Sequence, residues 1–217
     1  KTVCIDHHVS NTGFTDLSKI EPQASSACEV LYGTMDADKI SRNVAECIYT
    51  GIIHDTGVFK YSCTSKKTME IAGEMMEKGI DYSDIIDNTF YKKTYVQNQI
   101  LGRALLESVL FYDGKCIFTT VTTDEMEFYG VTGRELGGIV EQLRLTDGVE
   151  VAIFLYQTGE EEYKVSLRSK KKIDVAAIAT QFGGGGHVRA AGYTAKGSVY
   201  QIINSIGELI EKQYNAM

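Results

Sequence analysis

The stretch VEVAIFLYQTGEEEYKVSLRSKKKIDVAAIATQF, residues 149–182, carries the strongest indication of the fold class. Residues 149–156 are mostly apolar and predict a strand. Residues 163–168 predict a second strand, on which every other side chain shares one face of a sheet. Residues 173–182 carry apolar side chains at helical spacing and predict a helix. Strands and a helix in this succession indicate layered α/β structure.

The alternation of strands and helices extends from this stretch toward both ends of the chain. Further strands are predicted over 2–5, 59–62, 116–122 and 191–194, and further helices over 23–35, 41–54, 65–78, 134–145 and 199–213. Residues 81–110 are predicted to form one or two helices, because turn residues are scarce there. We therefore expect two α/β domains with largely parallel sheets and a cleft between the domains.

The two halves of this pattern define the expected domains. Residues 1–90 form the first domain, residues 111–217 form the second, and a connector helix over 91–110 joins them. The chain opens at Lys1 and runs directly into a strand. We therefore expect the first domain to be truncated at its N-terminus.

Composition and charge exclude several classes of protein. Of the 217 residues, 43% are hydrophobic and 24% are charged, which is typical of a globular chain and not of a disordered one. No stretch approaches the roughly 18 apolar residues of a membrane span, so no membrane partner is expected. The net charge of −7 argues against non-specific coating of DNA. The five cysteines include no C-x-x-C pair, which excludes a zinc knuckle and indicates core thiols of a reducing cytoplasm.

Asp6, His7 and His8 directly follow the first predicted strand. Functional side chains gather beyond the carboxyl ends of strands in open α/β sheets. Two adjacent histidines rarely serve a core, since their rings point to different sides and each ring needs polar partners. A carboxylate and an imidazole can together hold a divalent metal ion, while the second imidazole contacts a phosphate. A purely structural role for the tripeptide is the alternative.

A second carboxylate, Asp55, ends the helix predicted over 41–54. Taken alone, it is interpreted as a cap or turn residue. The residues that follow, Thr56 and Gly57, also suit an exposed loop that carries the carboxylate into a cleft.

Four consecutive glycines, 183–186, precede His187. Such a run costs much chain entropy on folding. A flexible linker would explain the run, but linkers are rarely enclosed by an apolar helix and a strand. We favour a loop in which the backbone N–H groups of Gly184, Gly185 and Gly186 approach an anion and His187 adds a hydrogen bond.

Lys164, Ser166 and Arg168 share one face of the strand predicted over 163–168. A serine and an arginine on the same face, near a glycine-rich loop, suit recognition of a phosphate or a base. The three lysines at 170–172 are more typical of a solvated turn.

Four segments of the chain resemble the DHH phosphoesterase superfamily with its type-1 DHH-associated domain. In order, they are CIDHHVSN at 4–11, GIIHDTGVFKYS at 51–62, VSLRS at 165–169 and GGGGHVRAAG at 183–192. Within the superfamily, the resemblance is to the nanoRNase/pAp-phosphatase branch, which degrades very short oligonucleotides and 3′-phosphoadenosine 5′-phosphate (pAp). It covers essentially the whole chain and implies a metal-dependent hydrolase.

The resemblance also implies roles for individual residues. His7 would ligate one of two Mn²⁺ ions, and Asp55 would ligate too, bridging both, with Mg²⁺ as the alternative metal. His8 would face the scissile phosphate, and Asp6 would orient the imidazoles from behind the ligands. In the second domain, the residues that would grip the far end of the nucleotide are Ser166, Arg168, Gly184, Gly185, Gly186 and His187.

The chain departs from the family pattern at its start. The family's other metal ligands lie upstream of the DHH motif, whereas only five residues precede Asp6 here. Two protein ligands, His7 and Asp55, are too few to hold two Mn²⁺ ions tightly. We therefore expect this chain by itself to be an impaired enzyme.

Related activities stay open as alternatives. A RecJ-type single-strand exonuclease shares the first motifs, a family-II pyrophosphatase shares the first half, and cyclic-dinucleotide phosphodiesterases share both halves. A non-enzymatic nucleotide-binding module is the alternative from another class. The expected substrates are short RNA oligonucleotides, pAp or linear dinucleotides, which the sequence does not rank because selectivity depends on pocket geometry. A homodimer is expected from the general frequency of dimers.

Overall fold

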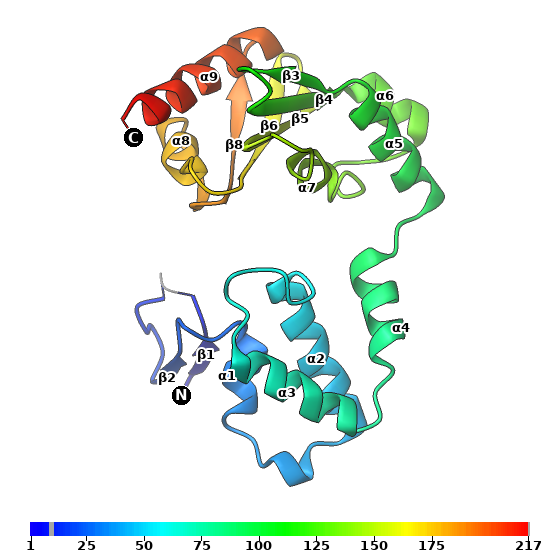
Figure 1. Cartoon of the computed structure of the whole chain (residues 1–217), viewed down its shortest axis with the longest axis vertical. Coiled ribbons are helices and arrows are strands. Elements are labelled where there is room, and N and C mark those ends of the chain that lie inside the picture. Colours follow the sequence, from blue (N-terminus) through cyan, green and yellow to red (C-terminus); the bar gives the residue numbers. More distant parts are fainter. Residues whose placement is uncertain (9–10, 217) are drawn as a thin grey trace. The chain divides into compact units, whose positions relative to one another are not determined.

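The fold is that of a computed structural model, in which residues 1–8 and 11–216 are described. Val9 and Ser10, which belong to the first family motif, lie outside the described residues. The chain divides into two compact units, Lys1–Lys92 and Lys93–Met217, and each unit is treated by itself (Figure 1).

The first unit combines a small sheet with several helices. Strand β1 (Val3–Asp6) pairs in parallel with β2 (Leu17–Ile20). The helical elements are α1 (Ala27–Tyr32), the 3₁₀ helix η1 (Ala37–Lys39), α2 (Arg42–Thr56), α3 (Lys66–Glu77), α4 (Tyr82–Ile86) and the π-helical turn η2 (Asp87–Tyr91). The predicted first strand and the helices over 41–54 and 65–78 are confirmed. The helix predicted over 23–35 is shorter than expected, and β2 was not predicted.

Helices α2 and α3 begin at residues that cap them. The Ser41 hydroxyl accepts a hydrogen bond from the Val44 N–H, and Ser65 forms a reciprocal capping box with Thr68. The apolar sides of the two helices then share one core, which includes Ile52 and Met75. This packing holds the C-terminal end of α2 in place.

The strand predicted over 59–62 is wrong. Val58 and Phe59 have φ angles of 55° and 63°, in the left-handed region, which interrupts any extended path. The buried Thr56 holds this turn. Its Oγ1 donates to the Ile52 carbonyl at 2.6 Å and accepts from the Phe59 N–H at 3.0 Å. The hydroxyl therefore prevails over the strand preference of the residues that follow.

The second unit is built on a six-stranded sheet in the part of the chain that the structure describes, with strand order β3-β4-β5-β6-β8-β7. Its strands are β3 (Val109–Phe111), β4 (Cys116–Val121), β5 (Val151–Gly159), β6 (Glu162–Ser169), β7 (Gly185–His187) and β8 (Ala190–Lys196). Its helices are α5 (Tyr95–Leu106), α6 (Thr123–Tyr129), α7 (Ile139–Arg144), α8 (Val175–Gln181) and α9 (Val199–Asn215). Elements β3, α6 and β7 were not predicted, and α7 begins later than expected.

The α/β class is confirmed, but largely parallel pairing is wrong for this sheet. Strands β4 and β5 are parallel, joined through α6 and α7, whereas the other four pairings of the described strands are antiparallel. The physical reason is the short turn between β5 and β6. Parallel strands need a long crossover connection. The two residues between β5 and β6 can join these strands only in antiparallel orientation.

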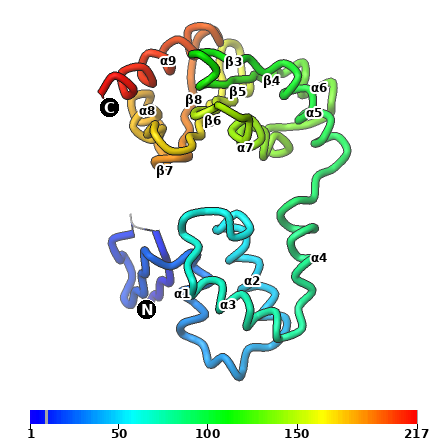
Figure 2. The backbone as a smooth tube through the Cα atoms, in the orientation of Figure 1, coloured from blue at the N-terminus to red at the C-terminus, as the bar shows by residue number. Residues whose placement is uncertain are grey.

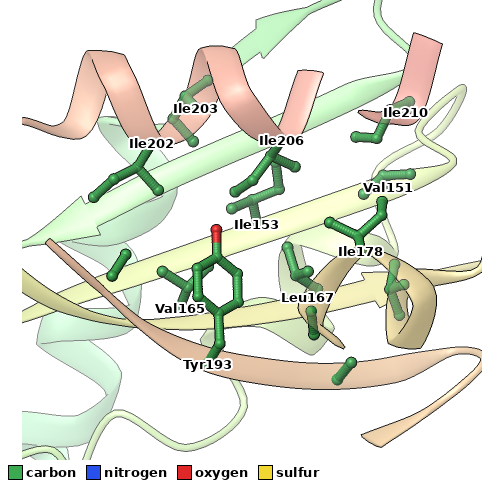
Figure 3. Close-up of a cluster of buried hydrophobic side chains, with 14 of the residues drawn as sticks. Val151, Ile153, Val165, Leu167, Ile178, Tyr193, Ile202, Ile203, Ile206 and Ile210 are labelled. Carbon is green, nitrogen blue, oxygen red and sulfur yellow. The ribbon is translucent and has the colours of Figure 1, made fainter. Parts of the chain in front are cut away.

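Both faces of the sheet are covered at its centre. Val151, Ile153 and Leu155 of β5 belong to the core beneath α8 and α9, which Figure 3 shows in close-up. Ala152 and Phe154 point the other way, into the core formed with α5 and α7. This explains why the stretch 149–156 is apolar at nearly every position.

The helix expected as a connector belongs to the second unit. Ile100 and Ala104 of α5 are buried in the core on one face of the sheet. The boundary between the units falls between Lys92 and Lys93, close to the start of the predicted connector. The tube in Figure 2 shows the chain running from α4 into α5 at this boundary.

Candidate functional site

The carboxylate of Asp6 organises the turn that follows β1. Its Oδ1 accepts hydrogen bonds from the His7 N–H at 2.7 Å, the His8 N–H at 3.1 Å and the His8 Nδ1 at 2.7 Å. Its Oδ2 accepts from the Asn11 amide at 2.6 Å. Hydrogen bonds from Asn11 and then from His8 hold the pKa of Asp6 well below its usual range. Asp6 is therefore an ionised orienting group.

His7 and His8 are oriented by different groups. The His8 ring is held by Asp6, whereas the His7 Nδ1 lies 3.2 Å from the carbonyl oxygen of Ala24. Asp6 was expected to orient both imidazoles; its carboxylate contacts the ring of His8, whereas the ring of His7 contacts the Ala24 carbonyl. A carbonyl can only accept, so the proton of a neutral His7 lies on Nδ1 and the lone pair on Nε2.

The lone-pair nitrogen of His7 faces Asp55. The distance from His7 Nε2 to Asp55 Oδ2 is 3.6 Å, and the two side chains are 20% and 47% exposed. Asp55 lies in the last turn of α2, one residue before its end. The structure brings together two side chains that are 48 positions apart in the sequence.

Close packing of α1 on α2 positions this pair. A Cβ atom at Gly51 of α2 would overlap the Cys28 side chain of α1. The glycine therefore lets α1 approach α2 closely. The segment before α1 carries Ala24, so the same contact sets the distance between the Ala24 carbonyl and the end of α2.

His7 and Asp55 have the donor chemistry of a partial metal site. An imidazole Nε2 and a carboxylate oxygen face each other, and the other ring nitrogen bonds a carbonyl, as is usual for histidines that bind metals. Across residues 1–8 and 11–216, no group of three or more His, Cys, Asp or Glu side chains could hold a metal ion. The pair thus fits two ligands of a metal centre and not a complete set.

The predicted substrate-binding residues of the second unit share one face of its sheet. Strand β8 lies between β6 and β7, and the register pairs Ser166 with Gly192 and Gly192 with Gly185. The next row pairs Arg168 with Ala190 and Ala190 with His187. Side chains in one row point to the same face. Alanine and glycine are small, so no large side chain of β8 separates Ser166 and Arg168 from His187.

Arg168 is held in place by an acidic partner that the sequence did not indicate. Its Nε donates to Glu141 Oε1 at 2.5 Å, and its Nη1 donates to the Leu167 carbonyl at 3.0 Å. The side chain is 27% exposed. Arg168 Nη2 has no hydrogen-bond partner among the described residues, so this nitrogen can donate to a bound anion.

The sequence favours a loop for the whole glycine run, but only part of the run is a loop. Gly185, Gly186 and His187 form the edge strand β7, which pairs with β8 (Figure 2). The reason lies in close backbone approach, since a Cβ at Gly184 or Gly186 would overlap the backbone of β8. An edge strand still directs part of its backbone N–H groups away from its partner.

Two contacts of the site could not be foreseen from the sequence. Ala24 acts through its main chain, so its residue type carries no signal. Glu141 lies in α7 and meets Arg168 only through the packing of that helix on β6. Asn11 ends the first family motif, and its side-chain amide is a partner of Asp6.

Comparison with known proteins identifies the class of the second unit. Residues 113–213 match the DHHA1 domain family. The chain also resembles a solved structure, an exopolyphosphatase-related protein from Bacteroides fragilis, with a TM-score of 0.89 and 27% identity. That alignment covers 97% of this chain and 63% of the other. The second unit is thus similar to DHHA1 domains, and the resemblance to DHH-family phosphoesterases is confirmed.

Among individual proteins, the chain is similar to the bifunctional oligoribonuclease and PAP phosphatase NrnA of two bacteria. It is 28% identical to the Bacillus subtilis protein, over 88% of this chain and 62% of that protein. It is 29% identical to the Thermus thermophilus protein, over 89% of this chain and 58% of that protein. This similarity supports the nanoRNase/pAp-phosphatase branch. The chain spans about three fifths of the length of these relatives.

The helices were also compared with what a membrane span requires. Among the described residues, none of them combines sufficient length with a sufficiently apolar sequence to cross a membrane.

Proposed function

We propose that this chain is part of a metal-dependent phosphoesterase that hydrolyses very short oligonucleotides and pAp. The observation that carries the proposal is the 3.6 Å approach of His7 Nε2 to Asp55 Oδ2, with the proton of the His7 ring directed to the Ala24 carbonyl. The relatives named oligoribonuclease and PAP phosphatase support the class of substrate. The proposed metal is Mn²⁺, with Mg²⁺ as the alternative.

In this proposal His7 and Asp55 hold the metal. Bound Mn²⁺ would lower the pKa of a coordinated water and neutralise charge on the phosphoryl oxygens. Because Nδ1 of His7 donates to Ala24, Nε2 keeps its lone pair for the metal without a change of tautomer. The neighbouring Asp55 carboxylate is held by α2, so neither ligand needs a large rearrangement.

Asp6 and His8 act on the phosphate. Asp6 accepts from Nδ1 of His8, which fixes the ring and directs Nε2 away from Asp6. A protonated Nε2 can donate to a phosphoryl oxygen or return a proton to the leaving oxygen. Asp6 stays ionised in the neutral pH range because its pKa is held low, so it remains a hydrogen-bond acceptor for His8.

The second unit binds the nucleotide in this proposal. Arg168 provides a charged donor, Ser166 a hydroxyl and His187 an imidazole on the same sheet face, and the edge strand from Gly185 to His187 provides backbone donors at the adjacent sheet edge. Gly184 allows the close approach of that strand to β8. Such a set suits a phosphate and a base of one or a few nucleotides.

The test is a hydrolysis assay with Mn²⁺ on pAp, pApA, RNA of three to five nucleotides, long single-stranded DNA, cyclic di-AMP and pyrophosphate. It compares the natural protein that contains this chain with its Asp55→Asn variant, and uses Asp38→Asn as a matched control on an exposed helix. Asp55→Asn should lower turnover of pAp and short RNA at least about 100-fold, because a ligand of the metal is lost. Asp38→Asn should leave turnover unchanged. Unchanged turnover in Asp55→Asn would refute the proposal.

A second candidate substrate is a cyclic dinucleotide. The chain is 25% identical, over 98% of its length, to the cyclic-di-AMP phosphodiesterase GdpP of Bacillus subtilis. Turnover of cyclic di-AMP above that of pAp would favour this candidate. Binding of nucleotides without turnover in the natural protein would favour the nucleotide-binding module.

A further inference from the structure

A fully enclosed carboxylate lies behind the candidate metal ligands. Glu29, in the first turn of α1, is 2% exposed. Its Oε2 accepts from the Ser25 hydroxyl at 2.6 Å, the Ser25 N–H at 3.2 Å and the Thr68 hydroxyl at 2.8 Å. Its Oε1 lies 3.7 Å from Lys67 Nζ. A buried carboxylate persists only when such partners satisfy it, so these contacts are specific.

The contact with the Ser25 N–H connects Glu29 to His7 through a single peptide group. The Ser25 N–H and the Ala24 carbonyl belong to the same peptide bond, and in a trans peptide they point in opposite directions. The N–H donates to Glu29 while the carbonyl lies 3.2 Å from His7 Nδ1. Hydrogen bonds on the two ends of one peptide strengthen each other, because each bond polarises the amide.

We propose that Glu29 is a positioning residue for His7, acting through the Ala24–Ser25 peptide. The carboxylate fixes the direction of this peptide and increases the negative charge on the Ala24 carbonyl oxygen. The carbonyl in turn keeps the His7 proton on Nδ1 and makes Nε2 a stronger donor to a metal. The part of this inference that concerns metal binding rests on the proposed function, whereas the part that concerns the tautomer does not.

A helix cap alone does not account for the arrangement. Glutamate in a first helical turn commonly reaches back to the backbone and stabilises the helix. Such a role predicts that loss of Glu29 lowers the free energy of unfolding and leaves the His7 ring as it was. The proposal predicts a change at the ring itself, which is a separate measurement.

The first measurement is the tautomer of His7 in the metal-free full chain, from ¹⁵N NMR shifts of the two ring nitrogens. We expect the Nδ1–H form to dominate in the unmodified chain. Glu29→Gln keeps the shape of the side chain and removes its charge, so the Nδ1–H population should fall partly. Glu29→Ala removes the acceptor altogether, so this variant should show the larger fall.

Thr68→Val is the matched control. It removes another hydrogen bond to the same oxygen of Glu29, and it also disrupts the capping box of α3. It should therefore lower the melting temperature but leave the Ser25–Glu29 contact and the His7 tautomer unchanged. If Thr68→Val shifts the tautomer as much as Glu29→Gln does, the effect is one of stability and the proposal is overturned.

The second measurement is a calorimetric titration of Mn²⁺ into the natural protein that contains this chain and into its variants with the same substitutions. Glu29→Ala should weaken the affinity at least about tenfold, Glu29→Gln less, and Thr68→Val hardly at all. A tautomer shift without Mn²⁺ binding by any of the chains would support the positioning role and count against the proposed metal site. Mn²⁺ binding with no change of tautomer or affinity in Glu29→Gln and Glu29→Ala would overturn the positioning role. If Glu29→Ala does not fold, the comparison of Glu29→Gln with Thr68→Val decides whether the positioning role of Glu29 holds.

Discussion

At the scale of single residues, His7 and His8 show how neighbouring identical side chains acquire different tasks. The ring of His8 has the Asp6 carboxylate at Nδ1. The ring of His7 has the Ala24 carbonyl at Nδ1, and its Nε2 faces Asp55. A ring that is to donate a proton and a ring that is to bind a metal need these two different partners.

The first residue-scale prediction concerns Arg168. Arg168→Lys keeps the positive charge but loses the planar set of donors that reaches Glu141 and leaves Nη2 for an anion. We expect KM for pAp to rise about tenfold and kcat to change little, since the residue binds the substrate away from the reacting bond. Steady-state kinetics on pAp measure both constants. A fall in kcat at constant KM would contradict this role.

The second residue-scale prediction concerns pH. Burial alone would raise the pKa of Glu29, but hydrogen bonds from Ser25 and Thr68 and the charge of Lys67 lower it below its usual value. Its charge therefore stabilises the fold above the pKa of an unfolded glutamate, about 4.3. This stabilisation is lost as the pH falls through the lower pKa of the folded state.

Urea unfolding of the unmodified chain and of Glu29→Gln checks this at pH 7, 5 and 3. The difference in the free energy of unfolding should be similar at pH 7 and 5 and smaller at pH 3. A difference that does not change with pH would show that the ionised form of Glu29 contributes nothing.

At the scale of elements, the approach of α1 to α2 controls the first unit. Gly51→Ala should destabilise the chain by about 1–3 kcal/mol, because the new methyl group overlaps Cys28 and pushes α1 away. Gly73→Ala in α3 is the matched control, since no atom lies within 4 Å of a Cβ there. The control should stabilise the chain by up to about 1 kcal/mol, because alanine favours helix. Chemical denaturation of both variants measures these changes.

The same variants separate stability from site geometry. Gly51→Ala should also weaken Mn²⁺ binding, because the displaced α1 carries the segment around Ala24 with it. Full affinity for Mn²⁺ in a destabilised Gly51→Ala chain would show that the α1–α2 contact does not position His7.

The elements also show what the sequence can and cannot predict. Helices α2 and α3 were predictable because Ser41, Ser65 and Gly79 mark their ends. Strand β7 could not be predicted, because glycines carry no strand preference. They are needed there because a Cβ atom at Gly186 would overlap the backbone of β8. The direction of β6 was missed because a short turn, and not the pattern of the strand, reverses the chain. Asp6, His7 and Asp55 could be chosen as candidates, but their contacts depend on packing between distant segments.

At the scale of the whole molecule, each unit has a core of its own. Buried Ile48, Tyr49 and Met75 belong to the first, whereas the sheet of the second has a core on each face. Separate cores predict separate cooperative unfolding of the two units.

Cysteine labelling can test this, because Cys116 lies in the second unit and the other four cysteines lie in the first. Burial raises the pKa of the Cys116 thiol to about 12, so it should react with iodoacetamide only when the second unit opens. Cys28 packs against the core of the first unit, so it should react fully only when that unit opens. Mass spectrometry of chains labelled along a urea gradient follows both thiols. A single shared midpoint for Cys28 and Cys116 would contradict the prediction.

The hydrogen bond between the Ala24 carbonyl and the His7 ring limits what mutagenesis can detect at this site. Replacing the buried Ala24 side chain changes local packing but leaves the carbonyl in place, so substitutions at position 24 do not report on the bond to His7. The importance of this group becomes visible only when the main chain itself is altered. An ester in place of the Ala24–Ser25 amide removes the N–H and weakens the carbonyl as an acceptor. Semisynthesis, and not mutagenesis, is therefore the method that can reveal what this part of the backbone does.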